Sequence, residues 1–304
     1  MYPLRGIFLK VLSVTAFVVM AALIKSTRVH IPAGEAVFFR SFFALPVIIV
    51  WLAFRREIRA GLQTKNPMAH VWRALIGTSA MGLGFTGLGM LPLPEVTAIG
   101  YAAPILTVIF AAMFLGEQVR AFRLSAVAIG MVGVMIILSP RLSGFGGASA
   151  ETLGAVIVFG SAVCGALASV FVRKMTAVES TSAIVFYFSL IASCLALLTI
   201  PFGWVIPTPR EVIFLILAGV FGGLGQIFLT SCYRFADASV IAPFDYTSMI
   251  FALLIGYFLF DEIPTKVVLI GAAVVISAGV LIIWRESRLG LERSRQRKVM
   301  TPQG

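Results

Sequence analysis

The segment ALLIGYFLFDEI (Ala252–Ile263) repeats the segment FAAMFLGEQV (Phe110–Val119) in its apolar character and in the acidic residue that closes it. Aligning Glu262 with Glu117 begins a match that extends outward along the chain. The apolar runs that follow, VISAGVLII and GMVGVMIIL, match with one extra residue, and earlier runs match at nearly the same spacing. The hydropathy pattern therefore indicates two copies of one unit, separated by the link PRLSGFGGASAE at 140–151.

The composition indicates whether water or lipid surrounds these two units. The chain has 304 residues, of which 60% are hydrophobic and only 12% charged, and its mean hydropathy is +1.02. A soluble domain carries about 25% charged residues, so lipid must cover most of this surface. A spanning helix needs about 20 apolar residues, and continuous rather than alternating runs favour helices over a barrel. Ten runs qualify: Gly6–Ile24, Gly34–Phe54, Val71–Met90, Glu95–Leu115, Phe122–Ser139, Thr152–Val172, Thr181–Ile200, Val212–Cys232, Ser239–Phe260 and Lys266–Trp284.

Five spans per unit is an odd number, so the second unit must enter the membrane in the opposite orientation. We therefore predict an all-α integral membrane protein made of ten transmembrane helices in two inverted five-helix repeats. The repeats cover 6–139 and 152–284, and a basic tail follows at 285–304. Inverted repeats are typical of secondary transporters, whose substrate site lies near the bilayer midplane between the repeats.

The net charge of +11 is compatible with nucleic-acid binding, but the positions of the basic residues argue against it. Lys and Arg concentrate in alternate links and in the tail, as the positive-inside rule requires when both termini are cytoplasmic. A basic cytoplasmic tail suits anionic lipid headgroups. The expected partners are thus the lipid bilayer and a small-molecule substrate, with no nucleic acid.

Other classes of function find little support in the sequence. The three cysteines lie in apolar runs, and with only two histidines a metal site is not expected. The sequence contains no phosphate-binding loop and neither of the motifs H-E-x-x-H and G-x-S-x-G, so we predict no cofactor, no ATP hydrolysis and no enzyme activity. A channel needs a continuous polar lining, and the polar residues within the spans are too sparse for one.

Asp245 is the most informative polar residue, because it lies six residues into the run Ser239–Phe260. A charge at the centre of a spanning helix costs roughly 2.5–3.5 kcal/mol. At 1.5 Å per residue Asp245 lies about 9 Å along the helix, too deep for its short side chain to reach the surface easily. It should face the bundle interior or a wet cavity. We expect either a substrate or proton-coupling site or a structural partner of Arg40 or of a backbone donor.

Four further residues are candidates for substrate binding. Arg40 could offer its planar fork to a carbonyl, carboxylate or phosphate, or serve structure alone. Tyr101 and Tyr246 occupy matching positions of the two units, and we expect them to flank a central cavity. Gln226 could line that cavity or bond across helices.

Prolines suggest where the spans depart from straight helices. Pro104 and Pro243 are expected to kink their spans and to free backbone carbonyls there. Pro243 comes two residues before Asp245, so local unwinding would expose backbone groups to the substrate.

Three longer motifs extend the pattern: EAVFFRSFF in the second span, LPLPEVTAIGYAAPILTVIFAAMFLGE through the fourth and DASVIAPFDYTSMIFALLIGYFLFDE through the ninth. With the five-plus-five repeat, they resemble the drug/metabolite transporter superfamily, in particular its EamA-domain members, and most of all bacterial riboflavin and S-adenosylmethionine uptake carriers. The resemblance implies a secondary transporter of the bacterial inner membrane that works by alternating access.

Two tyrosines in a mostly neutral cavity favour a ring-bearing, riboflavin-like cargo. The alternatives are uptake of S-adenosylmethionine or another nucleoside-like compound and export of aromatic amino acids or drugs. The sequence leaves open the direction of transport, ion coupling and whether the chain forms a homodimer.

Overall fold

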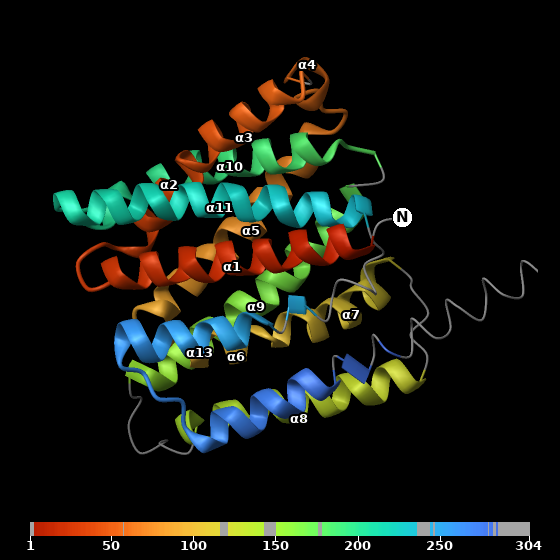
Figure 1. Cartoon of the computed structure of the whole chain (residues 1–304), viewed down its shortest axis with the longest axis vertical. Helices are drawn as coiled ribbons and strands as arrows, with labels where there is room; N and C mark the ends of the chain where they lie inside the picture. The colour runs from red at the N-terminus through yellow and green to blue at the C-terminus, as the bar shows by residue number, and fades with distance from the viewer. Residues whose placement is uncertain are drawn as a thin grey trace, which may run out of the picture.

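The computed structural model describes residues 3–56, 58–115, 121–142, 150–175, 178–235, 244–245, 247–278, 280–281 and 284. All regular structure in these residues is helical, and the helices form one bundle (Figure 1). This confirms the all-α fold expected from the continuous apolar runs. The elements are α1 Pro3–Thr27, α2 Ala33–Phe42, α3 Ala44–Phe54, α4 Ile58–Gly61, α5 Pro67–Leu88, α6 Leu93–Gly100, α7 Ala102–Leu115, α8 Ala121–Leu142, α9 Ala150–Met175, α10 Thr181–Leu197, η1 Ile200–Phe202, α11 Pro209–Phe235, α13 Thr247–Phe260 and a helix over Lys266–Ala278.

Four of the described helical stretches are long and apolar enough to cross a membrane: Leu4–Thr27, Ala33–Phe54, Ala150–Val172 and Pro209–Leu229. Shorter apolar helices cover Ala128–Ser139, Ser182–Leu197, Thr247–Phe260 and Lys266–Ala278. All eight overlap runs expected to span. Their apolar length is what the bilayer requires of a spanning helix.

Two expected spans are each broken at one residue inside the span, and the same chemistry breaks both. The first divides into α2 and α3 at Phe43, and the second into α6 and α7 at Tyr101. A proline follows three residues after each break, Pro46 and Pro104. Proline has no N–H to donate four residues back, and its ring clashes with the carbonyl there. The interruption at Tyr101 falls three residues before Pro104, where a kink was expected, whereas Pro243 lies outside the described residues.

The two predicted units are interlocked rather than side by side. Helix α1 of the first unit packs along α11 of the second, and α9 of the second packs along α5 of the first. Matching hydrogen bonds join these pairs: Ser13 Oγ donates to the Gly225 carbonyl at 2.8 Å, and Ser161 Oγ donates to the Ala80 carbonyl at 2.7 Å. The donors, like the acceptors, correspond in the alignment of the two units.

Close approach between helices depends on glycine. A Cβ placed on Gly87 of α5 would lie 2.1 Å from Val158 of α9, and one on Gly219 of α11 would lie 2.4 Å from Phe43 Cβ. These distances are shorter than real carbon contacts. Glycine at these positions therefore allows the helices to pack closely.

Candidate functional site

Two arginines meet at one aromatic ring where α2, α5 and α10 contact one another. The Arg73 guanidinium carbon lies 3.6 Å from the centre of the Phe188 ring, and that of Arg40 lies 5.7 Å from the same point. Arg40 is about 10 Å along its span from Ala33, while Arg73 is about 9 Å along α5 from the opposite end of the bundle. The three side chains therefore meet near the middle of the bundle.

Neither guanidinium has a counter-ion among the described residues. Arg40 is 3% exposed, and Nε and Nη1 of both arginines are buried without a hydrogen-bond partner. No carboxylate in the described part of the chain lies within 4.0 Å of either. Thr78 Oγ1 on α5 and Ser189 Oγ on α10 are also buried and without partners. Burying a charge without a counter-ion costs free energy. A buried, unpaired guanidinium therefore indicates a functional role.

Asp245 has a partner, but it is Lys10 rather than Arg40. The Lys10 ammonium lies 2.6 Å from the Asp245 carboxylate, and the two side chains are 3% and 44% exposed. Arg40, one of the structural partners expected for Asp245, is therefore not its partner. Asp245 also does not stand alone as a carboxylate inside the bundle, since Glu35, Glu95 and Glu179 are buried.

Tyr101 is linked to Asp245 by two hydrogen bonds that pass through Ser248. Its hydroxyl lies 2.7 Å from Ser248 Oγ, and Ser248 in turn donates to the backbone carbonyl of Asp245 at 2.7 Å. The Tyr101 side chain is buried at the break between α6 and α7. Two expected site residues are thus joined through a serine. The second tyrosine, Tyr246, lies outside the described residues.

Gln226 is half-buried on α11. At this level of the helix, the hydrogen bond that crosses to α1 uses the neighbouring Gly225 carbonyl, with Ser13 as donor. No hydrogen bond of the Gln226 amide is found within the described residues. Gln226 is therefore not linked to Arg40 or Asp245 by a hydrogen bond among the described residues.

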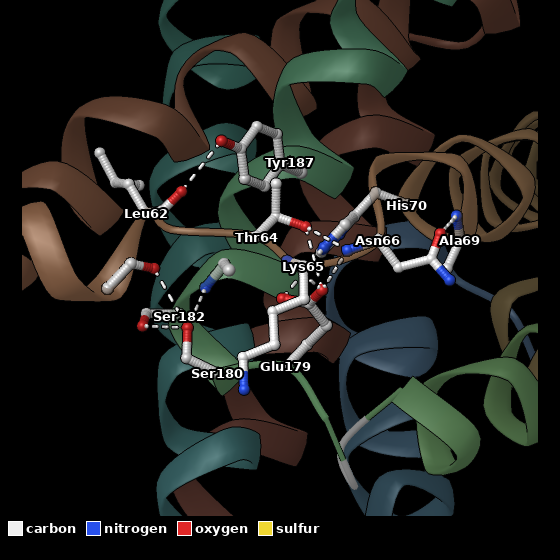
Figure 2. A network of polar contacts seen from close by, with 12 residues as sticks. Leu62, Thr64, Lys65, Asn66, Ala69, His70, Glu179, Ser180, Ser182 and Tyr187 are labelled. Atoms are coloured by element: carbon white, nitrogen blue, oxygen red, sulfur yellow. Dashed lines mark hydrogen bonds and ion pairs between the residues drawn. The ribbon is translucent and has the colours of Figure 1, made fainter.

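The two predicted units are also joined near one end of the bundle, around Glu179. One Glu179 carboxylate oxygen accepts from Thr64 Oγ1 at 3.0 Å and from the backbone N–H groups of Lys65 and Asn66 at 2.7 and 2.8 Å. The other oxygen lies 3.7 Å from His70 Nε2. Figure 2 shows this network between the loop before α5 and the loop before α10.

Further hydrogen bonds surround this network. Asn66 caps α5 by accepting from Ala69 N–H, and Ser180 caps α10 by accepting from Ala183 N–H. Tyr187 donates to the Leu62 carbonyl at 2.9 Å. Burial opposes ionisation of Glu179, but the hydrogen bonds from Lys65, Asn66 and Thr64 outweigh it and leave its pKa below the usual value.

The opposite end is held by two other carboxylates. Lys25 Nζ lies 2.9 Å from Glu262, whose second oxygen accepts from Leu93 N–H at 2.8 Å. Glu35 accepts a single described hydrogen bond, from Val205 N–H at 3.2 Å. Glu262 therefore acts as the loop anchor that its position at a helix end suggests, whereas Glu117 lies outside the described residues.

Sequence reasoning overlooked Lys10, Arg73, Phe188 and Glu179. A signal for the first two was present, because both are charges inside expected spans and the argument made for Asp245 applies equally to them. Phe188 is one of 25 phenylalanines, and Glu179 sits in a link, so neither stands out before the helices are assembled.

Comparison with known proteins identifies the family to which the chain belongs. The model of the EamA-like transporter family matches residues 4–139 and, separately, 152–285. The chain therefore belongs to the EamA-like transporter family, and the resemblance based on the motifs of the second, fourth and ninth spans is confirmed. It is a multi-pass membrane protein of a family that moves small molecules.

Individual relatives differ in what they carry. The chain is 31% identical to the pseudopaline exporter CntI of Pseudomonas aeruginosa, over 91% of this chain and 95% of the exporter. It is 29% identical to the S-adenosylmethionine uptake transporter of Rickettsia bellii, over 86% and 87% of the two chains. It is 28% identical to the riboflavin transporter of Rhizobium johnstonii, over 86% and 84%. Three different cargoes at similar identity do not select one for this chain.

A solved crystal structure matches with a TM-score of 0.65, covering 92% of this chain and 98% of the other at 21% identity. At this identity the match establishes a common fold. It extends over nearly the whole bundle, so the arrangement of helices that brings the buried arginines together belongs to a fold already observed.

Proposed function

We propose that the chain is a secondary carrier that moves a small ring-bearing metabolite by alternating access between two inverted five-helix repeats, 6–139 and 152–284. The observation that carries this proposal is the pair of matching serine-to-carbonyl hydrogen bonds, α1 to α11 and α9 to α5. Equivalent contacts made in both directions are expected when two related units face each other across a pseudo-twofold axis. The two separate matches to one family model give further support.

The carboxylate contacts at the two ends suit the same mechanism. Glu179 joins the units near one end of the bundle, and Glu35 and Glu262 join them near the other. Opening one end would break one set of contacts and leave the other closed. Alternation between two such states would carry a cargo across without a continuous pore.

For the cargo, a riboflavin-like ring system is favoured, with S-adenosylmethionine or another nucleoside-like compound, or export of aromatic amino acids or drugs, as alternatives. Tyr101 offers a flat ring and a hydroxyl near the middle of the bundle, and Tyr246 is its proposed counterpart. Riboflavin and S-adenosylmethionine transporters among the relatives agree with a ring-bearing cargo. Arg40 and Gln226 complete the proposed set of binding residues.

Asp245 is the proposed proton-coupling residue. Protonation would remove its charge and release the Lys10 ammonium at 2.6 Å, so proton binding would change the contact between α1 and the residue pair Phe244–Asp245. Asp245→Asn should abolish proton-dependent uptake while the protein still inserts into the membrane. Uptake with an unchanged response to a pH gradient in this variant would rule out the coupling role.

Counterflow into proteoliposomes tests the carrier function. Vesicles preloaded with unlabelled riboflavin should accumulate labelled riboflavin faster than empty vesicles, with saturable kinetics, and the same assay is run with S-adenosylmethionine and tryptophan. Flux that is linear in concentration and insensitive to preloading would indicate a channel instead. Chemical conversion of the cargo by purified protein would indicate an enzyme.

The proposed location is the bacterial inner membrane, with both termini and the basic tail, 285–304, in the cytoplasm. Protease protection of N-terminal and C-terminal epitope tags in inverted vesicles tests it. Both tags should be cleaved from the cytoplasmic side. Cleavage of one tag and protection of the other would contradict an even number of spans.

A further inference from the structure

We infer that Arg40 and Arg73 form a subsite for an acidic group of the cargo, a carboxylate or a phosphate, at the junction of α2, α5 and α10. The inference rests on the proposed carrier function, because it assigns this subsite to the transported molecule. It concerns the charge of the cargo, whereas the ring-bearing nature of the cargo was argued from the tyrosines.

The two arginines bring like charges close together inside the bundle. Two guanidinium groups lie within 5.7 Å of the centre of one ring, and the described residues provide no carboxylate within 4.0 Å of either. Like charges placed together in a low dielectric repel strongly unless an anion lies close by. An oxyanion bound between the two arginines would compensate both charges at once.

Both guanidinium groups have N–H groups that no protein acceptor uses. Arg73 lies 3.6 Å from the centre of Phe188, a distance at which the cation uses the face of the ring. Stacking of this kind leaves the N–H edge of a planar guanidinium available. Nε and Nη1 of both arginines have no hydrogen-bond partner. Nε–H and Nη1–H belong to the two different donor edges of a guanidinium, each edge shared with Nη2, and either edge can form paired hydrogen bonds with a carboxylate or phosphate.

Two glycines make room for the arginines between the helices. A Cβ on Gly77 would lie 2.5 Å from Arg73 Nη1, and one on Gly222 would lie 3.0 Å from Arg40 Nε. Glycine at these two positions gives each guanidinium space beside a neighbouring backbone. The arginines are thus accommodated by α5 and α11 and are held at defined places in the bundle interior.

The inference changes the ranking of cargoes. Riboflavin carries no acidic group that is ionised at neutral pH, whereas S-adenosylmethionine and aromatic amino acids carry a carboxylate. Within the proposed class, a ring-bearing metabolite that also carries a carboxylate or phosphate suits the described site better than a neutral ring does.

Matched pairs of probes test the inference on the purified full-length protein. The pairs are tryptophan with tryptophanamide, which differ in the carboxylate, and riboflavin 5′-phosphate with riboflavin, which differ in the phosphate. Binding is measured by calorimetry. The charged member of at least one pair should bind about tenfold tighter or more, the range expected for charge-assisted hydrogen bonds. The pair that responds distinguishes a carboxylate from a phosphate.

Variants then locate the preference. Arg40→Met and Arg73→Met should each reduce it to less than about twofold, and Gly77→Ala should weaken it by crowding Arg73. Gly82→Ala is the matched control, because it lies on the same helix and its added Cβ meets nothing within 4 Å. Equal binding of neutral and charged members, a preference that survives both arginine variants, or no binding of any probe would each overturn the inference.

The two proposals fail in different ways. If the wild-type protein performs riboflavin counterflow and the arginine variants do so equally well, the carrier function stands and the acidic subsite falls. If acids bind in an arginine-dependent manner but no cargo shows counterflow, the subsite stands and the carrier function falls.

Discussion

Lys10 and the pair Arg40 and Arg73 are all basic groups inside the bundle, yet only Lys10 has its counter-ion within the described protein. The Lys10–Asp245 contact at 2.6 Å means that the bundle can supply a carboxylate to a buried cation. The lack of one at the arginines is therefore a property of that location. A charge that is neutralised internally contributes to the folded structure, whereas an uncompensated charge is suited to a ligand.

The largest expected effect comes from breaking the internal pair. Asp245→Asn leaves the buried Lys10 ammonium without its counter-ion and should lower the free energy of unfolding by about 2–3 kcal/mol, less than for a fully buried pair because Asp245 is 44% exposed. Thermal unfolding in detergent measures it. The double variant Lys10→Met, Asp245→Asn should recover most of the loss. No recovery would mean that Asp245 stabilises the protein through other contacts.

Removing the uncompensated charges should change stability in the opposite direction. The double variant Arg40→Met, Arg73→Met removes two like charges from the interior and keeps most of the side-chain volume, so it should raise the free energy of unfolding by about 1–2 kcal/mol in the absence of cargo. The same thermal assay applies. A clear loss of stability would show that the arginines support the fold directly, and the contrast with Lys10 would then disappear.

A smaller effect is expected at the Glu179 network. Its folded-state pKa is lowered, so its contribution to stability is fully present above the unfolded pKa of about 4.3 and is lost as the pH falls through the folded value. Glu179→Gln should cost about 1 kcal/mol near neutral pH and should flatten the acid side of the stability curve. Unfolding measured between about pH 3 and 7 tests both. An unchanged acid dependence would show that another carboxylate is responsible.

The smallest effects are expected for glycines of α5 in the apo protein. Gly82→Ala should change stability by no more than about 1 kcal/mol, in the direction of helix propensity. Gly77→Ala should cost somewhat more, because its added Cβ would lie 2.5 Å from Arg73 Nη1 and 2.9 Å from the Phe188 ring, so at least one of these side chains must shift. A much larger loss at Gly77 would mean that the arginine cannot move aside and would place it in the packed core.

Much of the fold could be predicted from the sequence. Continuous apolar runs identify helices, and Pro104 identifies the break at Tyr101, because both depend on local chemistry. The internal match between the segments ending at Glu117 and Glu262 suggests the duplication. What could not be predicted is how α1 and α9 each pack on the other unit, because helix pairing depends on glycine and side-chain contacts far apart in the chain.

The site was harder to predict than the fold. Asp245 and Tyr101 were selected for depth in a span and repeat symmetry, and the structure links them through Ser248. The partner of Asp245 was not predictable, because Lys10 lies on a helix far away in sequence. Arg73 was visible as a charge within a span, but its relation to Arg40 depends on Phe188, which only the packed helices bring between them.

The interruptions at Phe43 and Tyr101 have a mechanical consequence. Each divides a rod of the bundle into two short segments joined by a pivot, with a proline preventing the segments from fusing into one straight rod. In the carrier proposed above, such a pivot would let one segment tilt while the other keeps its place. Movement at one membrane face would then not have to reach the other, so the two faces could respond in turn.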